Sequence, residues 1–250
     1  METIAEILVD TNSFRTDGPL HESVADKIRK SGEPVYPSSA CASGGDVFML
    51  KKINRGRLIV IAAGGGVEPG PGFRGDVRRI DAGGTTVTVK ECPVTHENSL
   101  RLRDALPFTA PSVLGMNTSF GMGDRLGIAT PGHIRASRGY AFNPIFPQQS
   151  IREMERTGRT PSKVMDDACL GVFQEGFRKK FGADADHLKT EENVRETAAA
   201  GFTFYTIDPS DHLDQEADKL SGDKLSKAFD ELFEGQAEKK QLLERYTGKK

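Results

Sequence analysis

The chain has 250 residues, of which 36% are hydrophobic and 28% are charged, and this balance predicts a globular protein with a buried core rather than a disordered or fibrous one. The formal net charge is −2, so the composition offers no general attraction to nucleic acid or to an anionic membrane, and we expect a small-molecule ligand. The sequence has no apolar run of the roughly 18–20 residues that a membrane-spanning helix needs, and no signal-peptide pattern at its start, which predicts a cytoplasmic protein.

Three cysteines, Cys41, Cys92 and Cys169, lie far apart in the sequence and show no C-x-x-C spacing. This pattern suggests neither a disulfide framework nor a thiolate zinc site. We expect them to be reduced and structural.

The amino-terminal part contains glycine-rich turns and short strand candidates. Residues 47–51, 57–62 and 85–90 are rich in branched residues and predict strands. The stretch 62–75 is rich in glycine, but it lacks the GK[ST] ending of a phosphate-binding loop and its prolines block a following helix, so we interpret it as a surface loop. Residues 1–110 are therefore predicted to form a small α+β domain.

From residue 111 onward the pattern becomes strand, loop and helix, repeated. The helix starts and stops are marked by residues of known capping preference. The expected starts are Thr130 before Pro131, the capping box of Ser150 and Glu153, Thr160 before Pro161, and Thr190; the expected stops are Gly158 and Gly201. The helix that starts at Pro161 is expected to carry an apolar stripe formed by Val164, Ala168, Val172, Phe173, Phe177 and Phe181. Strand candidates precede these helices at 119–120, 144–146, 183–188 and 202–208.

Strands that return through helices are parallel, and this favours a (β/α) barrel. A whole barrel of this type usually needs about 250 residues, whereas the chain offers about four strand units before a charged segment, 226–246, that predicts one amphipathic helix. The predicted fold is α/β, a partial TIM-type (β/α) barrel over 111–250 preceded by the α+β domain of 1–110. Three explanations remain open: the sequence lacks a carboxyl-terminal half, a second copy completes the barrel in a homo-oligomer, or the fold is a smaller open α/β sheet.

Two Asp-His pairs, Asp186-His187 and Asp211-His212, lie 25 residues apart, each near the end of a predicted strand. Barrel enzymes collect their active-site groups from the carboxyl ends of different strands, since all of these ends open onto one face. Adjacent side chains of a strand point to opposite faces, so Asp186 and His187 can reach one site only if the backbone turns there. A hydrogen-bonded core histidine is the alternative for His187, and an ordinary turn is the alternative for the second pair.

Further polar residues follow the predicted strands. Arg125 and Lys189 could bind a substrate carboxylate, which Arg can hold through two parallel hydrogen bonds. Asp124 could equally be the structural partner of Arg125. Gln148 and Gln149 could bind sugar hydroxyls or could bond the loop backbone; Gln149 is taken as the candidate.

The stretches SFGMGDRLGIATPGHIRA, PIFPQQSIREMERTGRTPSKVMDDACLGVFQEGF, FGADADHLKT and GFTFYTIDPSDHLD, in this order, resemble the tagaturonate epimerase family over residues 95–213. The resemblance implies interconversion of D-tagaturonate and D-fructuronate in hexuronate catabolism with a divalent metal cation. It further implies that Asp186 is the proton acceptor and His187 a metal ligand, and that the family's proton donor and other metal ligands lie further along than this chain extends.

The chemistry of these keto-uronates favours a retro-aldol route. The two epimers differ at a carbinol carbon β to the ketone, where no adjacent carbonyl acidifies the C–H bond. A base can instead take the hydroxyl proton, after which the neighbouring C–C bond breaks to an aldehyde and an enediolate that recombine on the other face. A divalent cation stabilises an enediolate as a Lewis acid.

Two alternatives stay open. One is a metal-dependent aldolase or sugar isomerase, which would use the same enediolate chemistry and, as an aldolase, would release aldehyde fragments. The other is a truncated, non-catalytic relative that cannot assemble a full coordination shell; a single histidine with carboxylates would bind divalent ions weakly, whereas a complete site has three or more protein ligands.

Overall fold

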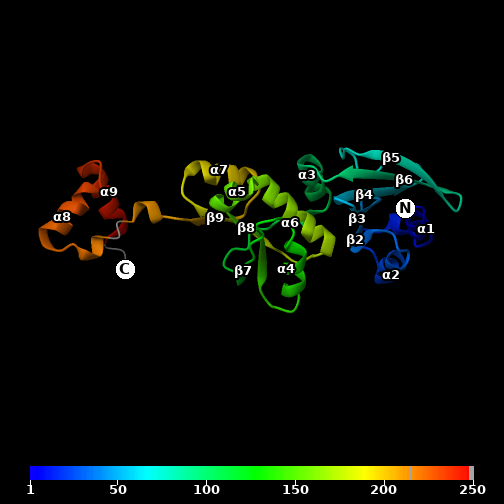
Figure 1. Cartoon of the computed structure of the whole chain (residues 1–250), viewed down its shortest axis with the longest axis horizontal. Coiled ribbons are helices and arrows are strands. Elements are labelled where there is room, and N and C mark those ends of the chain that lie inside the picture. The colour runs from blue at the N-terminus through cyan, green and yellow to red at the C-terminus, as the bar shows by residue number, and fades with distance from the viewer. Residues whose placement is uncertain (214–215, 248–250) are drawn as a thin grey trace. The chain divides into compact units, whose positions relative to one another are not determined.

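The computed structural model describes residues 1–213 and 216–247, apart from the side chain of His212. The chain forms two compact units, Met1–Ile207 and Asp208–Lys250. The first unit contains both sheets of the described chain, one antiparallel and one parallel (Figure 1). The fold is therefore a mixed α/β fold, as the sequence predicts.

The antiparallel sheet has six strands in the order β1-β2-β3-β4-β6-β5. Its strands are β1 (Gly18–Pro19), β2 (Val35–Ser43), β3 (Asp46–Ile53), β4 (Gly56–Gly64), β5 (Asp76–Ala82) and β6 (Thr85–Pro93). The three strands expected from branched residues correspond to β3, β4 and β6, and the glycine-rich stretch after β4 is a loop, as predicted. Three helices accompany the sheet: α1 (Glu2–Asp10), α2 (Glu22–Lys30) and α3 (His96–Ala105).

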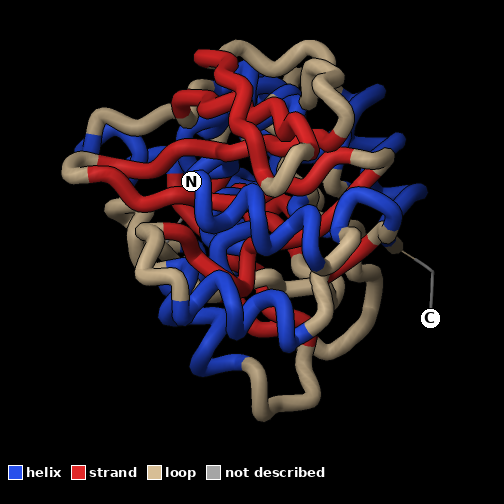
Figure 2. The backbone as a smooth tube through the Cα atoms, turned by 90° about the vertical axis from the view of Figure 1, so that its right-hand side faces the viewer, coloured by secondary structure: helices blue, strands red, loops and turns tan. Residues whose placement is uncertain are grey.

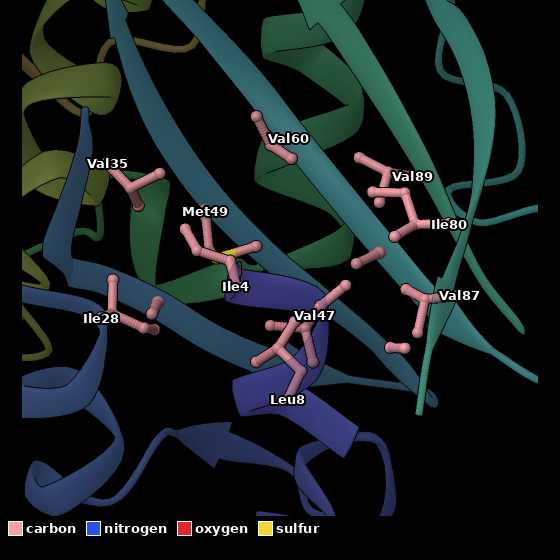
Figure 3. Close-up of a cluster of buried hydrophobic side chains, with 14 of the residues drawn as sticks. Ile4, Leu8, Ile28, Val35, Val47, Met49, Val60, Ile80, Val87 and Val89 are labelled. Atoms are coloured by element: carbon pink, nitrogen blue, oxygen red, sulfur yellow. The ribbon is translucent and has the colours of Figure 1, made fainter. Parts of the chain in front are cut away.

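Both faces of this sheet are buried, which explains why its central strands are apolar at successive positions. On one face, Ile4 and Leu8 of α1 pack with Val47 and Met49 of β3 (Figure 3). The helix at the amino terminus lies over the strands when the chain is viewed from this end (Figure 2). The alternate residues of β3 point to the other face, where they join a cluster that includes Phe173 from a later helix.

The parallel sheet has four strands in the order β10-β9-β8-β7, so strands that follow one another in the chain are neighbours in space. They are β7 (Ser119–Gly121), β8 (Asn143–Ser150), β9 (Gly182–Leu188) and β10 (Phe204–Ile207). The helices between them are α4 (Thr130–Ser137), α5 (Ile151–Thr157), α6 (Pro161–Glu175) and α7 (Glu191–Ala199). All three strand pairs are parallel, so the predicted strand-helix repeat is confirmed. The pairing changes from antiparallel to parallel between Pro93 and Ser119; the domain boundary at residue 110 stays a prediction.

Most of the expected helix caps of this region are present. Ser150 and Glu153 form a reciprocal capping box, and Gly158 ends α5 in the left-handed conformation. The side chains of Thr160 and Thr190 accept hydrogen bonds from the first turns of α6 and α7. These contacts satisfy backbone N–H groups that have no partner inside the helix.

Within the strand-helix repeat, two details of the helix prediction were wrong. Thr130 does not cap α4, because its hydroxyl donates to Asp124 and the N-cap position is Ala129. The apolar stripe is not one continuous helix, because α6 ends at Gly176 in the left-handed conformation. Phe177 and Phe181 follow that end and still pack in the same buried cluster as Val172.

The sequence predicted one helix over 226–246, but the structure divides this segment between two helices. Helix α8 (Gly222–Glu231) and helix α9 (Gln236–Tyr246) are separated by a break before Gly235. Two short 3-10 turns, Ser210–His212 and Ala217–Lys219, precede them in the second unit. None of the helices that the structure describes has the length and apolar character needed to cross a membrane.

Candidate functional site

A cleft of about 600 Å³ lies at the carboxyl ends of β7, β8 and β9. One wall is the loop after β7, which includes Asp124 and Arg125, and the remainder is formed by Gln148, Glu153 and Asp186. This is the end of the parallel sheet at which the sequence predicted the functional groups to gather. Asp186 and Arg125, from different strand-helix units, therefore line the same cleft.

The backbone turns at His187. Such a turn is what the side chains of Asp186 and His187 need in order to reach the same site. His187 has a φ of 56°, a left-handed conformation that residues with side chains adopt uncommonly. Its side chain is 60% exposed, and its Nδ1 lies 2.7 Å from Oδ1 of Asp186. His187 is thus not a buried core residue, and the contact through Nδ1 leaves Nε2 as the ring nitrogen that can bind a ligand or a cation.

Asp184 lies two positions before Asp186 and therefore on the same face of β9. It is buried, and its carboxylate accepts hydrogen bonds from Oγ1 of Thr206 at 2.9 Å and from Nε2 of Gln148 at 3.2 Å. Burial raises the pKa of Asp184, the two hydrogen bonds oppose that rise, and the charge of Asp186 adds to it. Gln148 of β8, Asp184 of β9 and Thr206 of β10 thus form one hydrogen-bonded row across three neighbouring strands.

The sequence interpretation missed Asp184 and passed over Gln148 and Thr206. The i, i+2 spacing of the aspartates in GADADHL was the available signal for Asp184. The alignment of Gln148 with Asp184 depends on the pairing of β8 with β9, which no local pattern reveals.

Arg125 forms an ion pair with Glu153 at the rim of the cleft. The same carboxylate accepts a hydrogen bond from Nε2 of Gln149 at 3.0 Å. Burial raises the pKa of Glu153, but the bonds from Arg125 and Ser150 outweigh it, so the pKa lies below its usual value. Gln149 is only 1% exposed and does not line the cleft, whereas its neighbour Gln148 does.

Asp124 is not the structural partner of Arg125. Its carboxylate accepts hydrogen bonds from five consecutive backbone N–H groups, from Leu126 to Thr130, and from the hydroxyl of Thr130. It thereby fixes the loop that carries Arg125.

The other candidate residues lie as follows. Lys189 comes directly after β9 and is exposed, and it makes interactions within the structure. Asp211 lies on the 3-10 turn Ser210–His212 of the second unit, and the side chain of His212 lies outside the described residues. The proposed roles of these three residues stay predictions.

The described residues do not form a complete metal site. No group of three or more His, Cys, Asp and Glu side chains among them could hold a metal ion. His187 and Asp186, which contact each other, offer fewer ligands than the three or more that a divalent cation usually takes from a protein. The implied metal therefore does not fit the described residues by themselves.

In α/β enzymes that act on small molecules, the active site lies at the carboxyl ends of the parallel strands. The fold and the polar cleft of this chain place it in that class. The comparisons with known proteins narrow this class. The family model of UxaE, tagaturonate epimerase, matches residues 36–250. The chain belongs to the tagaturonate epimerase family.

Two relatives show how far the similarity extends. The tagaturonate/fructuronate epimerase of Thermotoga maritima is 42% identical over 220 residues, which are 88% of this chain and 43% of that protein. A crystal structure of the fructuronate-tagaturonate epimerase UxaE from Cohnella laeviribosi with one glycerol aligns with a TM-score of 0.72 at 36% identity, over 91% of this chain and 44% of that one. Its native crystal structure aligns with a TM-score of 0.71. The chain thus spans less than half the length of the relatives that it matches.

Proposed function

We propose that this chain carries part of the active site of an epimerase that interconverts D-tagaturonate and D-fructuronate by retro-aldol and aldol steps. The observation that carries the proposal is the position of Asp186 in a cleft at the strand ends of a chain 42% identical to a tagaturonate/fructuronate epimerase. The four consecutive parallel strands support the further proposal that this region is the first part of a TIM-type barrel. We propose the cytoplasm as its location.

Asp186 is the proposed base. It takes the proton of the substrate hydroxyl, the electron pair of that O–H bond forms the aldehyde C=O, and the adjacent C–C bond breaks to leave an enediolate. The aldehyde turns over, the enediolate attacks its other face, and Asp186 returns the proton to the new alkoxide. The buried row of Asp184, Gln148 and Thr206 fixes the strand ends and places a second carboxyl next to Asp186.

Substrate binding is proposed for the cations and polar groups near the strand ends. Arg125 lines the cleft and would hold the uronate carboxylate after exchanging or sharing its ion pair with Glu153. Lys189, Asp211 and His212 are the further substrate-binding candidates. Gln149 is buried and does not line the cleft, so its neighbour Gln148, which does, is proposed in its place.

His187 is proposed as one ligand of a divalent metal cation. Because the described residues lack a full set of ligands, the others would come from a carboxyl-terminal half like that of the longer relatives, or from a second copy of the chain.

The test is the substitution Asp186→Asn in the 250-residue chain, with turnover followed in both directions by NMR in the presence of divalent cations. Loss of the base should reduce the rate by about a hundredfold to ten-thousandfold. The exposed Asp104 provides a matched control, Asp104→Asn, which should leave the rate unchanged. Retained turnover in Asp186→Asn would refute the assignment.

A measurement of metal affinity distinguishes two roles for Asp186, that of the base and that of a residue that only orients His187. If Asp186 is the base, Asp186→Asn should bind divalent cations as the parent chain does, while His187→Ala should bind them more weakly. An equal loss of metal affinity in both variants would make Asp186 a positioning residue for His187.

A non-catalytic role is the second candidate, since the chain spans less than half of its relatives and holds no complete metal site among the described residues. It predicts no turnover by the parent chain under any of these conditions. An aldolase would instead release aldehyde fragments, which a carbonyl-trapping reagent would capture.

A further inference from the structure

A second cavity, of about 770 Å³, lies on the other side of the loop that bounds the cleft. The two hollows share Ile128 and Ala129 as lining residues. The second cavity lies between the turn that joins β3 to β4 and the first turn of α4. Its size suits a small molecule.

The ionisable lysine, arginine and histidine side chains that line this cavity are cations, or, for histidine, can be protonated to one. They are Lys52, Arg57, His133 and Arg135, and none of the described lining residues is acidic. The chain as a whole has a net charge of −2, so this concentration of cations does not follow from its composition. A concave surface lined by one sign of charge attracts the opposite sign.

Two of these cations have no carboxylate partner among the described residues. The only hydrogen bond of the Arg57 guanidinium there goes from Nη1 to Oε1 of Gln174 at 3.1 Å. Lys52 is exposed and forms no ion pair there. Arg135 differs, because Glu175 holds it through two hydrogen bonds.

Arg57 is the more informative of the two, because its side chain is partly buried. Burial lowers the pKa of Arg57, and the negative charges of Asp167 and Asp124 oppose this shift. A guanidinium has five N–H donors, and one bond to a neutral amide leaves most of them for solvent or a ligand. Removing such a cation from water without a bonded anion is costly.

We propose that this cavity binds a small dianion of the phosphate class through the Arg57 guanidinium and the Lys52 ammonium. A dianion neutralises both unpaired cations, and a phosphate group accepts the paired hydrogen bonds that guanidinium offers, together with the point charge of lysine. A phosphate ester and free phosphate share this chemistry. The loop between the cavity and the cleft would then contact a bound ligand on either side.

The experiment is calorimetric titration of the full 250-residue chain, at low ionic strength, with inorganic phosphate, glucose 6-phosphate and galacturonate. Both phosphate compounds should bind saturably, and galacturonate, a monoanion, should bind more weakly. Tighter binding of glucose 6-phosphate than of phosphate would identify an ester as the ligand, and the reverse would identify the free anion.

Matched variants locate the binding. Arg57→Gln and Lys52→Gln should each weaken phosphate binding by about tenfold or more, because each removes a charged hydrogen-bond donor. Arg55→Gln removes the same charge from the same turn, but Arg55 does not line the cavity, so its affinity should not change. Arg125→Gln, in the neighbouring cleft, should also bind phosphate as the parent chain does.

The proposal is overturned by absence of saturable binding, by galacturonate binding as tightly as phosphate, or by equal losses in Arg55→Gln and Arg57→Gln. Loss of binding in Arg125→Gln would place the anion in the cleft instead and would also overturn the proposal. Lys52 is exposed, so Lys52→Gln keeps the test decisive if Arg57→Gln does not fold, which circular dichroism would show.

Discussion

The carboxylate of Asp124 holds together the loop that separates the cleft from the cationic cavity. Burial raises the pKa of Asp124, but the backbone N–H donors from Thr130 back to Gly127 outweigh this, and the pKa lies below its ordinary value. The folded state therefore stabilises the ionised form of this side chain.

Asp124→Asn should lower the free energy of unfolding at neutral pH by about 1–3 kcal/mol, since the amide nitrogen cannot accept the bonds that one carboxylate oxygen accepts. The stabilisation by Asp124 is present above the unfolded-state pKa of about 3.9 and is lost as the pH falls through the lower folded-state pKa. Urea unfolding at a series of pH values measures both effects. The variant should lose less stability on acidification than the parent chain.

The control for this prediction is again Asp104→Asn, whose side chain is exposed. It should unfold like the parent chain at every pH. Equal destabilisation of the two variants would show that the loop does not depend on the Asp124 carboxylate.

At the scale of single residues, the sequence predicted those positions that are local. Asp186 and His187 lie just before the last residue of β9, and the chain itself marks this strand end, since Thr190 caps the next helix. The bonds of Asp184 to Gln148 and Thr206 join three strands, and they depend on register, which is set by packing rather than by neighbours in the sequence.

At the scale of elements, the sequence predicted the end of α5 at Gly158 but missed the end of α6 at Gly176. The two ends can be compared directly. Gly158 and Gly176 end α5 and α6 in the same left-handed conformation, with φ of 63° and 58°. They differ in their surroundings. A Cβ at Gly158 would meet no atom within 4 Å, whereas a Cβ at Gly176 would collide with the backbone oxygen of Ser38.

Gly158→Ala should therefore cost only the left-handed backbone penalty, about 1 kcal/mol of unfolding free energy. Gly176→Ala should cost roughly 2 kcal/mol more, because the strand that carries Ser38 must move. Chemical denaturation of both variants gives the comparison. Equal costs would mean that α6 does not approach β2 as closely as described.

The elements that the sequence missed lack local signals. Strand β2 contains Pro37 and a run of small residues, and its pairing with β3 is interrupted by a register shift. Strand β5 has only Ile80 and Ala82 buried, and its other residues, Val77 included, are exposed. The break between α8 and α9 falls in a segment whose charge pattern continues across it, so periodicity alone joined the two helices.

At the scale of the whole molecule, the two sheets share helix α6. Its Leu170 and Phe173 pack against the antiparallel sheet, while Val164, Met165 and Cys169 pack on the parallel one. The cysteines lie in these clusters, and all three are free and buried. Burial raises the pKa of Cys92 to about 11 and that of Cys169 to about 11, and it also raises the pKa of Cys41.

Thiol labelling should report on the integrity of this packing. Because the thiolate is the reactive form, the three cysteines should be almost inert to a maleimide or disulfide reagent near neutral pH in the folded chain, and all three should react in denaturant. Mass spectrometry after timed labelling measures this. Rapid modification of Cys169 under native conditions would contradict the burial of α6.

The strand-helix repeat was predictable because each crossover is local, and the sequential order of β7 to β10 follows from it. The order of β5 and β6 in the antiparallel sheet was not predictable. β5 follows β4 in the sequence, but it is β6 that pairs with β4, and β5 lies on the far side of β6. Only the fit of both faces to their helices selects that arrangement.

Among the described strands, β7 pairs only with β8, and β10 pairs only with β9. These two outer strands carry the exposed side chains of Phe120, Phe204 and Ile207. The unpaired backbone N–H and C=O groups of such edge strands, next to exposed hydrophobic side chains, allow another polypeptide to add a strand. Concentrated solutions of the isolated chain are therefore prone to intermolecular β-association, and lysine or proline introduced along β10 would be the natural remedy.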